Sequence, residues 1–130
     1  MAAVYIDTSV LGRLLLGEPG AQAIEEALSE YDEHVSSRVL RLELRRLGLR
    51  NDRLDLADRL IADVALLPLD ESRLRAAETI PPAGGASLDS LHLAAAVELA
   101  EADLLDTVMT HDKRLAEGAR HHGLTVLAPA

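Results

Sequence analysis

Short apolar runs alternate with longer stretches in which apolar residues recur at helical spacing. In one of these longer stretches Leu40, Leu44 and Leu47 share one stripe, which predicts an amphipathic helix. Strands that alternate with helices are typical of an α/β fold with a mostly parallel sheet, so we expect four to five short strands flanked by helices. The predicted strands are Val4–Ile6, Glu33–Val35, Val64–Leu67, a segment within Leu104–Thr110, and Leu124–Leu127.

Capping residues and breakers set the expected ends of the helices. Thr8 or Ser9 is expected to cap a first helix, which Gly17 ends. Ser87 is expected to cap a helix that is apolar nearly all round and therefore largely buried. The helices predicted are 8–16, 20–30, 38 to about 47 with Ser36 or Ser37 as its cap, one that starts at Asn51 or Asp52, 70 to about 79, 87 to about 101, and 113–122 before Gly123.

Composition limits the class of protein. A chain of 130 residues fits one domain, residues 1–130, and the core must be aliphatic because Trp and Phe are absent. The absence of cysteine excludes disulfides and thiolate metal sites. No apolar run reaches membrane-span length, and the first residues lack the pattern of a signal peptide. We therefore expect a soluble, cytoplasmic protein that does not bind membranes.

The net charge of −9 disfavours attraction of a polyanion to the whole surface, so any nucleic acid must be recognised locally. The basic residues are unevenly placed, because six arginines lie between positions 38 and 53. This cluster is either a solvated helix face or a local binding surface.

Two predicted strands end within two residues of an aspartate. Asp7 follows Val4–Ile6, and Asp112 follows the strand that ends near Thr110. In a parallel sheet both acids would lie at the same edge, in the crevice where ligands bind. Aspartate is also a frequent helix N-cap, so capping and ligand binding both remain open for each residue.

Two further acids lie on predicted helices. Glu43 borders the stripe of Leu40 and Leu44, and an acid at the edge of a buried face needs a partner, which Arg46 or Arg50 could supply as an ordinary ion pair. Asp89 lies in the first turn of the apolar helix, where the helix dipole favours a negative charge. We expect the nearby His92 to be a hydrogen-bonded core residue rather than a ligand.

Four carboxylates in one place require a compensating charge. Two like charges about 4 Å apart repel by roughly 4 kcal/mol at an effective dielectric of 20. An all-oxygen ligand set suits Mg²⁺ or Mn²⁺ better than zinc. Such a cation also activates water and neutralises phosphate oxygens, which makes an acidic site compatible with a polyanionic substrate.

At these residues the chain resembles a PIN-domain protein, and in particular the VapC toxins of bacterial toxin–antitoxin pairs. The resemblance covers nearly the whole chain. It rests on the order and spacing of Tyr5-Ile6-Asp7-Thr8-Ser9, Arg41-Leu42-Glu43-Leu44, Leu88-Asp89-Ser90-Leu91-His92-Leu93-Ala94-Ala95-Ala96, Thr110-His111-Asp112-Lys113-Arg114-Leu115 and Gly123-Leu124-Thr125-Val126-Leu127.

The resemblance implies an endoribonuclease dependent on Mg²⁺ or Mn²⁺, with tRNA or rRNA as the substrate class. It implies that Asp7, Glu43, Asp89 and Asp112 are catalytic residues and hold the metal, with Asp106 as an alternative to the last. Hydroxyls of Thr8, Ser9 and Thr110 would orient the carboxylates. It further implies a homodimer and a VapB-type antitoxin, and Arg46 and Arg50 are the residues expected to contact RNA or antitoxin.

Two other classes fit part of the pattern. A phosphate-accepting receiver domain would use Asp7, Asp70 and Lys113, but it has no acid beside Asp7 and leaves Glu43 and Asp89 unexplained. A catalytically inactive PIN fold would serve only as a binding module. The retention of all four acids argues against this alternative.

Overall fold

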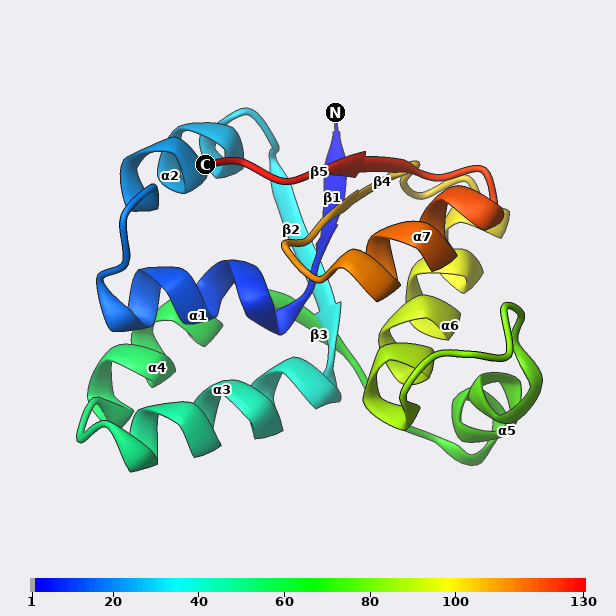
Figure 1. Ribbon diagram of the computed structural model, residues 1–130, viewed down its shortest axis with the longest axis horizontal. Coiled ribbons are helices and arrows are strands. Elements are labelled where there is room, and N and C mark those ends of the chain that lie inside the picture. Colours follow the sequence, from blue (N-terminus) through cyan, green and yellow to red (C-terminus); the bar gives the residue numbers. More distant parts are fainter. Residues whose placement is uncertain (1) are drawn as a thin grey trace.

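A computed structural model describes residues 2–130 as a five-stranded sheet covered by helices on both faces (Figure 1). None of the helices in this part of the chain is both long and apolar enough to cross a membrane. The elements in chain order are β1 (Ala3–Ile6), α1 (Thr8–Leu16), α2 (Ala21–Ser29), β2 (Glu33–Ser37), α3 (Arg38–Arg50), α4 (Leu54–Ala62), β3 (Ala65–Leu67), α5 (Glu71–Thr79), α6 (Ser87–Glu101), β4 (Thr107–Met109), α7 (Lys113–His121) and β5 (Thr125–Leu127).

The strand order is β3-β2-β1-β4-β5, and all four pairings are parallel. The predicted α/β class is therefore confirmed, with a sheet that is parallel throughout. β1 lies at the centre, where Tyr5 pairs with Val35 of β2 and with Val108 of β4. The chain first builds outward from β1 through β2 to β3 and then returns to the other side of β1. In open α/β sheets ligands bind outside the carboxyl ends of the strands at such a reversal, which here lies between β1 and β4.

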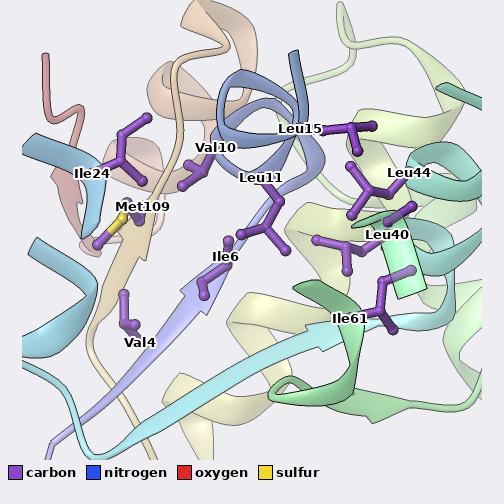
Figure 2. Packing of buried hydrophobic residues seen from close by; sticks show 11 residues of the cluster. Val4, Ile6, Val10, Leu11, Leu15, Ile24, Leu40, Leu44, Ile61 and Met109 are labelled. Atoms are coloured by element: carbon purple, nitrogen blue, oxygen red, sulfur yellow. The ribbon is translucent and has the colours of Figure 1, made fainter. Parts of the chain in front are cut away.

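Alternate residues of β1 supply two separate cores, because successive side chains of a strand point to opposite faces. Val4 and Ile6 pack with Met109 and with apolar residues of α1, α2, α3 and α4 (Figure 2). Tyr5 points to the other face, where it packs with α6, α7 and Val108. The expectation that α6 is largely buried is met by its six buried residues.

Two glycines allow close contact between helices. A Cβ atom at Gly118 of α7 would lie 2.9 Å from Leu93 Cδ2 of α6. A Cβ atom at Gly48 of α3 would lie 3.0 Å from Ala57 Cβ of α4 and 3.1 Å from the Arg53 carbonyl oxygen. At both positions the neighbouring helix occupies the space of a side chain.

Several predicted helix ends were wrong by a few residues. Asp7, rather than Thr8 or Ser9, caps α1, and Ala86 precedes α6 without a side-chain cap where Ser87 was expected. α3 continues through Gly48 to Arg50, because that glycine packs against α4 instead of ending the helix. α4 begins at Leu54, since Asp52 adopts a left-handed conformation with a φ of 54°. Ser37 caps α3 as predicted.

Candidate active site

Asp7 and Asp112 both cap helices at the carboxyl edge of the sheet. The Asp7 carboxylate is buried, with 4% of the residue exposed, and its Oδ1 accepts hydrogen bonds from the Ser9 amide at 3.2 Å and the Ser9 hydroxyl at 2.6 Å. Asp112 Oδ1 accepts from the amides of Arg114 at 2.8 Å and Leu115 at 3.1 Å. The capping role is therefore confirmed for both. It engages Oδ1 of each carboxylate and is compatible with a ligand at the second oxygen.

Hydroxyl groups connect the ends of β1 and β4. Ser9 Oγ accepts from the His111 amide at 2.8 Å while it donates to Asp7. Thr110 Oγ1 accepts from the Asp112 amide at 2.9 Å, and the Asp7 amide donates to the Met109 carbonyl at 3.2 Å. Since β1 and β4 are hydrogen-bonded neighbours, these contacts fix the separation of the two capping aspartates.

Glu43 of α3 reaches the same edge through Thr8 and His92. Its Oε1 accepts from Thr8 Oγ1 at 2.6 Å and lies 3.1 Å from His92 Nε2. Burial acts to raise the pKa of Glu43, but the hydrogen bonds from His92 and Thr8 outweigh it and hold that pKa below its ordinary value. The alternative of an ordinary ion pair with Arg46 or Arg50 is excluded, because within residues 2–130 neither arginine forms a salt bridge with Glu43.

His92 is a buried, fully hydrogen-bonded residue, as predicted, with 2% of its surface exposed. Its Nδ1 lies 2.8 Å from the Tyr5 hydroxyl, and its Nε2 faces Glu43. The sequence interpretation missed this link between His92, Tyr5 and Glu43. One signal was available: a half-buried glutamate needs a donor, and His92 lies one helical turn from Asp89.

Asp89 lies in the first turn of α6, within electrostatic reach of both capping aspartates. Burial, the charge of Asp112, hydrogen bonding with Asp112 and the charge of Asp7 together raise its pKa to about 6. The pKa of Asp7 is also raised, mainly by burial, although its hydrogen bond from Ser9 opposes the shift. Asp89 therefore lies close enough to Asp7 and Asp112 for their negative charges to oppose its ionisation.

The donor chemistry of these residues suits a hard divalent cation, since all of the candidate ligands are carboxylate oxygens. A bound cation would favour the ionised form of each aspartate and so oppose the rise in pKa. Within residues 2–130, however, no group of three or more His, Asp or Glu side chains is already arranged to hold a metal ion. The acids are therefore neighbours whose side chains do not converge on one point.

Asp106 lies at the other end of β4 from Asp112. It precedes Thr107, the first residue of the strand, and accepts a hydrogen bond from the Thr107 hydroxyl at 2.8 Å. Its side chain is exposed to solvent. Because Asp7 lies at the carboxyl edge, Asp112 is the acid of this pair that is near Asp7.

Comparison with known proteins agrees with this fold. Residues 4–121 match the family model described as PIN domain. The chain belongs to the PIN-domain family.

Three relatives are similar to this chain over nearly their whole length. Ribonuclease VapC47 of Mycobacterium tuberculosis (strain CDC 1551 / Oshkosh) is 34% identical over 133 residues, which cover 97% of this chain and 96% of the relative. Ribonuclease VapC46 of Mycobacterium tuberculosis (strain ATCC 25618 / H37Rv) is 32% identical over 132 residues, which cover 100% of both chains. Ribonuclease VapC35 of the same species is 28% identical. The resemblance to VapC-type PIN ribonucleases is thereby confirmed.

Proposed function

We propose that this chain is the endoribonuclease toxin of a VapBC-type pair, and that Asp7, Glu43, Asp89 and Asp112 bind Mg²⁺ or Mn²⁺ and form its catalytic site. The observation that carries the proposal is the hydroxyl network at the edge where β1 meets β4, in which Ser9 bonds to Asp7 and to the His111 amide and Thr110 bonds to the Asp112 amide. Glu43 joins this network through Thr8, which directly follows Asp7. Full-length similarity to proteins named ribonucleases supports the same conclusion.

The chain's own residues hold the carboxylates ready for such a cation. His92 and Thr8 keep Glu43 ionised, and the Ser9 hydroxyl orients Asp7. Thr110 fixes the backbone of Asp112. When bound, the cation supplies charge that neutralises a phosphate oxygen and lowers the pKa of a water molecule.

The proposed partners follow from charge. An acidic edge of this kind attracts a basic side chain, which the C-terminal tail of a VapB-type antitoxin would offer. Arg46 and Arg50 are exposed on the side of α3 that carries Glu43, where they would contact RNA or antitoxin. We further propose a cytoplasmic homodimer that acts on RNA of the tRNA or rRNA class.

The receiver alternative has no support from the fold. Asp70 caps α5 beyond the edge strand β3, where it forms an ion pair with Arg73 at 3.1 Å. Since β3 lies two strands from β1, Asp70 and Asp7 do not share a crevice. The inactive-module alternative does not explain why all four acids remain and why the relatives are named ribonucleases.

The proposal is tested by Asp7→Asn and Asp89→Asn. Asparagine caps helices about as well as aspartate, so Asp7→Asn removes charge while it preserves the start of α1. We expect both variants to lose growth inhibition on expression, RNA cleavage by the purified protein and Mn²⁺ binding in a calorimetric titration. Asp70→Asn is the matched control, because it alters a helix-capping aspartate away from the site. If both site variants cut RNA as well as this control, the assignment of the acids is wrong.

A further inference from the structure

The first turn of α7 carries two basic residues that the fold does not explain. Lys113 and Arg114 are the first two residues of this helix and directly follow its cap, Asp112. The start of a helix bears partial positive charge, so cations are unfavourable there and favourable at the other end. Arg120 and His121 in the last turn of α7 therefore stabilise the helix, whereas Lys113 and Arg114 weaken it.

Neither cation has an ion-pair partner within residues 2–130. Both residues are exposed, and neither takes part in a salt bridge. Glu117 lies one turn further along α7, at the spacing of an ordinary surface pair, yet it pairs with neither of them. Helix stability and surface pairing thus leave the two charges unaccounted for.

The two cations lie beside the candidate active site. β1 and β4 are paired neighbours, so α1 and α7 begin at the same edge of the sheet (Figure 1). Lys113 directly follows Asp112, but the cations do not offset the crowding of the aspartates. The pKa of Asp89 stays raised to about 6, mainly by burial and further by the charges of Asp112 and Asp7. The positive charge is therefore available to a ligand from outside the chain.

We propose that Lys113 and Arg114 bind the backbone phosphate of RNA that neighbours the phosphate being cleaved. The inference rests on the proposed ribonuclease function and names residues that hold its substrate. A chain with a net charge of −9 can hold a polyanion only through local contacts of this kind. The arginine can form two parallel hydrogen bonds to phosphate oxygens, and the lysine adds a mobile point charge.

An acidic protein segment fits this position less well. The first turn of α7 exposes charge but no apolar side chain, because Leu115 and Ala116 are buried. Protein interfaces draw most of their binding energy from a few buried, largely apolar anchors, whereas a phosphate needs only charge and hydrogen-bond donors. Contacts to phosphate also carry no sequence information, so this site would hold the strand in register whatever its bases.

Salt-dependent binding tests the proposal with the full chain. The probe is a short, fluorescein-labelled oligouridylate, and its binding is measured by anisotropy. Ca²⁺ replaces Mn²⁺ in the buffer, which keeps a hard cation available to the acids, and a denaturing gel checks that the probe stays intact. We expect Lys113→Gln/Arg114→Gln to weaken binding ~2–5-fold for each charge removed. The slope of log Kd against log salt concentration should fall by ~0.7 for each charge.

Two further variants separate charge from side-chain identity and from position. Lys113→Arg should keep the salt slope of the parent, because it keeps the charge. Arg120→Gln is the matched control, since it removes a cation from the last turn of the same helix. The proposal is overturned if the double variant keeps the parent's slope, or if Arg120→Gln lowers the slope equally. It is also overturned if an oligoglutamate peptide binds the parent more tightly than oligouridylate does.

Lys113 is the only lysine of the chain, so a single side-chain amine reports on its surroundings. We expect oligouridylate to slow the acetylation of Lys113, measured by mass spectrometry of the peptide that contains it. Acetylation at the same rate with and without oligouridylate would overturn the contact.

Urea unfolding shows whether the two cations serve the fold instead. Gln, Lys and Arg have similar helix propensities, so removing the cations from the start of α7 should raise the urea midpoint. Arg120→Gln should lower it, because it removes a favourable charge from the last turn. A double variant that is less stable than the parent would show that the cations stabilise α7, and the proposal would fail.

RNA cleavage with Mn²⁺ separates this inference from the proposed function. We expect the loss in Lys113→Gln/Arg114→Gln to fall mainly on KM rather than on kcat. If the parent cleaves no RNA, the proposed function fails and this inference falls with it. If the parent cleaves RNA and the double variant does so with the same KM, only the phosphate contact is wrong.

Discussion

His92 Nε2 lies 3.1 Å from Glu43 Oε1, and the opposite ring nitrogen lies 2.8 Å from the Tyr5 hydroxyl. Burial raises the pKa of Tyr5, so its hydroxyl stays protonated and can donate to Nδ1. The ring then carries its proton on Nε2 and donates to Glu43. The contacts form a chain from the central strand, through α6, to a carboxylate on α3.

Replacing His92 with alanine should therefore disturb Glu43 as well as the core. The substitution leaves the Tyr5 hydroxyl without its partner and opens a cavity, at a cost of about 2–4 kcal/mol of unfolding free energy. It also removes the donor that lowers the pKa of Glu43. The acid limb of the pH–rate profile should therefore shift to higher pH. Urea unfolding and RNA cleavage as a function of pH measure the two effects.

His92→Gln distinguishes positioning from packing, because its amide can still donate to Glu43. We expect it to lose stability, yet to keep an acid limb close to that of the parent. An alanine variant whose pH profile matches the parent would show that His92 does not position Glu43.

Asp89→Asn should stabilise the metal-free protein at neutral pH. The folded pKa of about 6 lies above the ordinary value of 3.8, so the folded state binds more protons and stability falls as pH rises from about 4 to 6. Above pH 6 Asp89 is ionised in the folded protein and its full electrostatic cost is present. Asparagine carries no charge and removes that cost. After discounting for solvent screening and for the lost helix-dipole contact, we expect a gain of about 1 kcal/mol.

Urea unfolding with EDTA at pH 4 and pH 7.5 measures this gain, which should vanish at the lower pH. Asp55→Asn is the matched control, since Asp55 also lies in the first turn of a helix. If Asp89→Asn and Asp55→Asn change stability equally at pH 7.5, the crowding of the aspartates has no energetic effect.

Asp112→Asn and Asp106→Asn should differ sharply, because the two acids lie at opposite ends of β4. Asparagine preserves the cap of α7, so loss of function in Asp112→Asn reports on charge. We expect its Mn²⁺ affinity to fall on the order of 100-fold, while that of Asp106→Asn stays unchanged. Isothermal titration measures both, and weaker metal binding by Asp106→Asn alone would reverse the assignment.

Gly48→Ala should destabilise the protein by about 1–3 kcal/mol, because the new methyl group meets the Arg53 carbonyl and Ala57 Cβ, which cannot move independently. Gly12→Ala is the control within α1. Its nearest neighbour is the flexible end of Leu47 at 3.3 Å, and alanine favours the helix, so its effect should be close to neutral. Thermal unfolding ranks the two variants, and equal melting temperatures would contradict the expected clash at Gly48.

The fold class could be predicted because alternating strands and helices permit few arrangements. The exact helix starts could not, because Asp7, Thr8 and Ser9 are all good N-caps and the choice depends on where each side chain points. The extent of the domain, residues 1–130, stays a prediction.

Within the site, the proximity of Asp7 and Asp112 could be predicted from one rule, since parallel strands end at the same edge. Whether the strands are neighbours depends on the strand order, which a single sequence does not give. The sequence signalled that Glu43 needs a donor but did not identify His92 as that donor, because the contact requires α6 to reach both Tyr5 and α3 across the sheet. The assignment of the four acids as metal ligands stays a prediction.

The close packing of Gly118 against Leu93 links an apolar position on α7 to the spacing of the acids. Asp112 precedes α7 and Asp89 lies at the start of α6, so a side chain at 118 that pushes Leu93 away would also change the gap between these carboxylates. A mutational scan scored by RNA cleavage should therefore mark position 118 as intolerant, although it contributes no polar atom to the reaction.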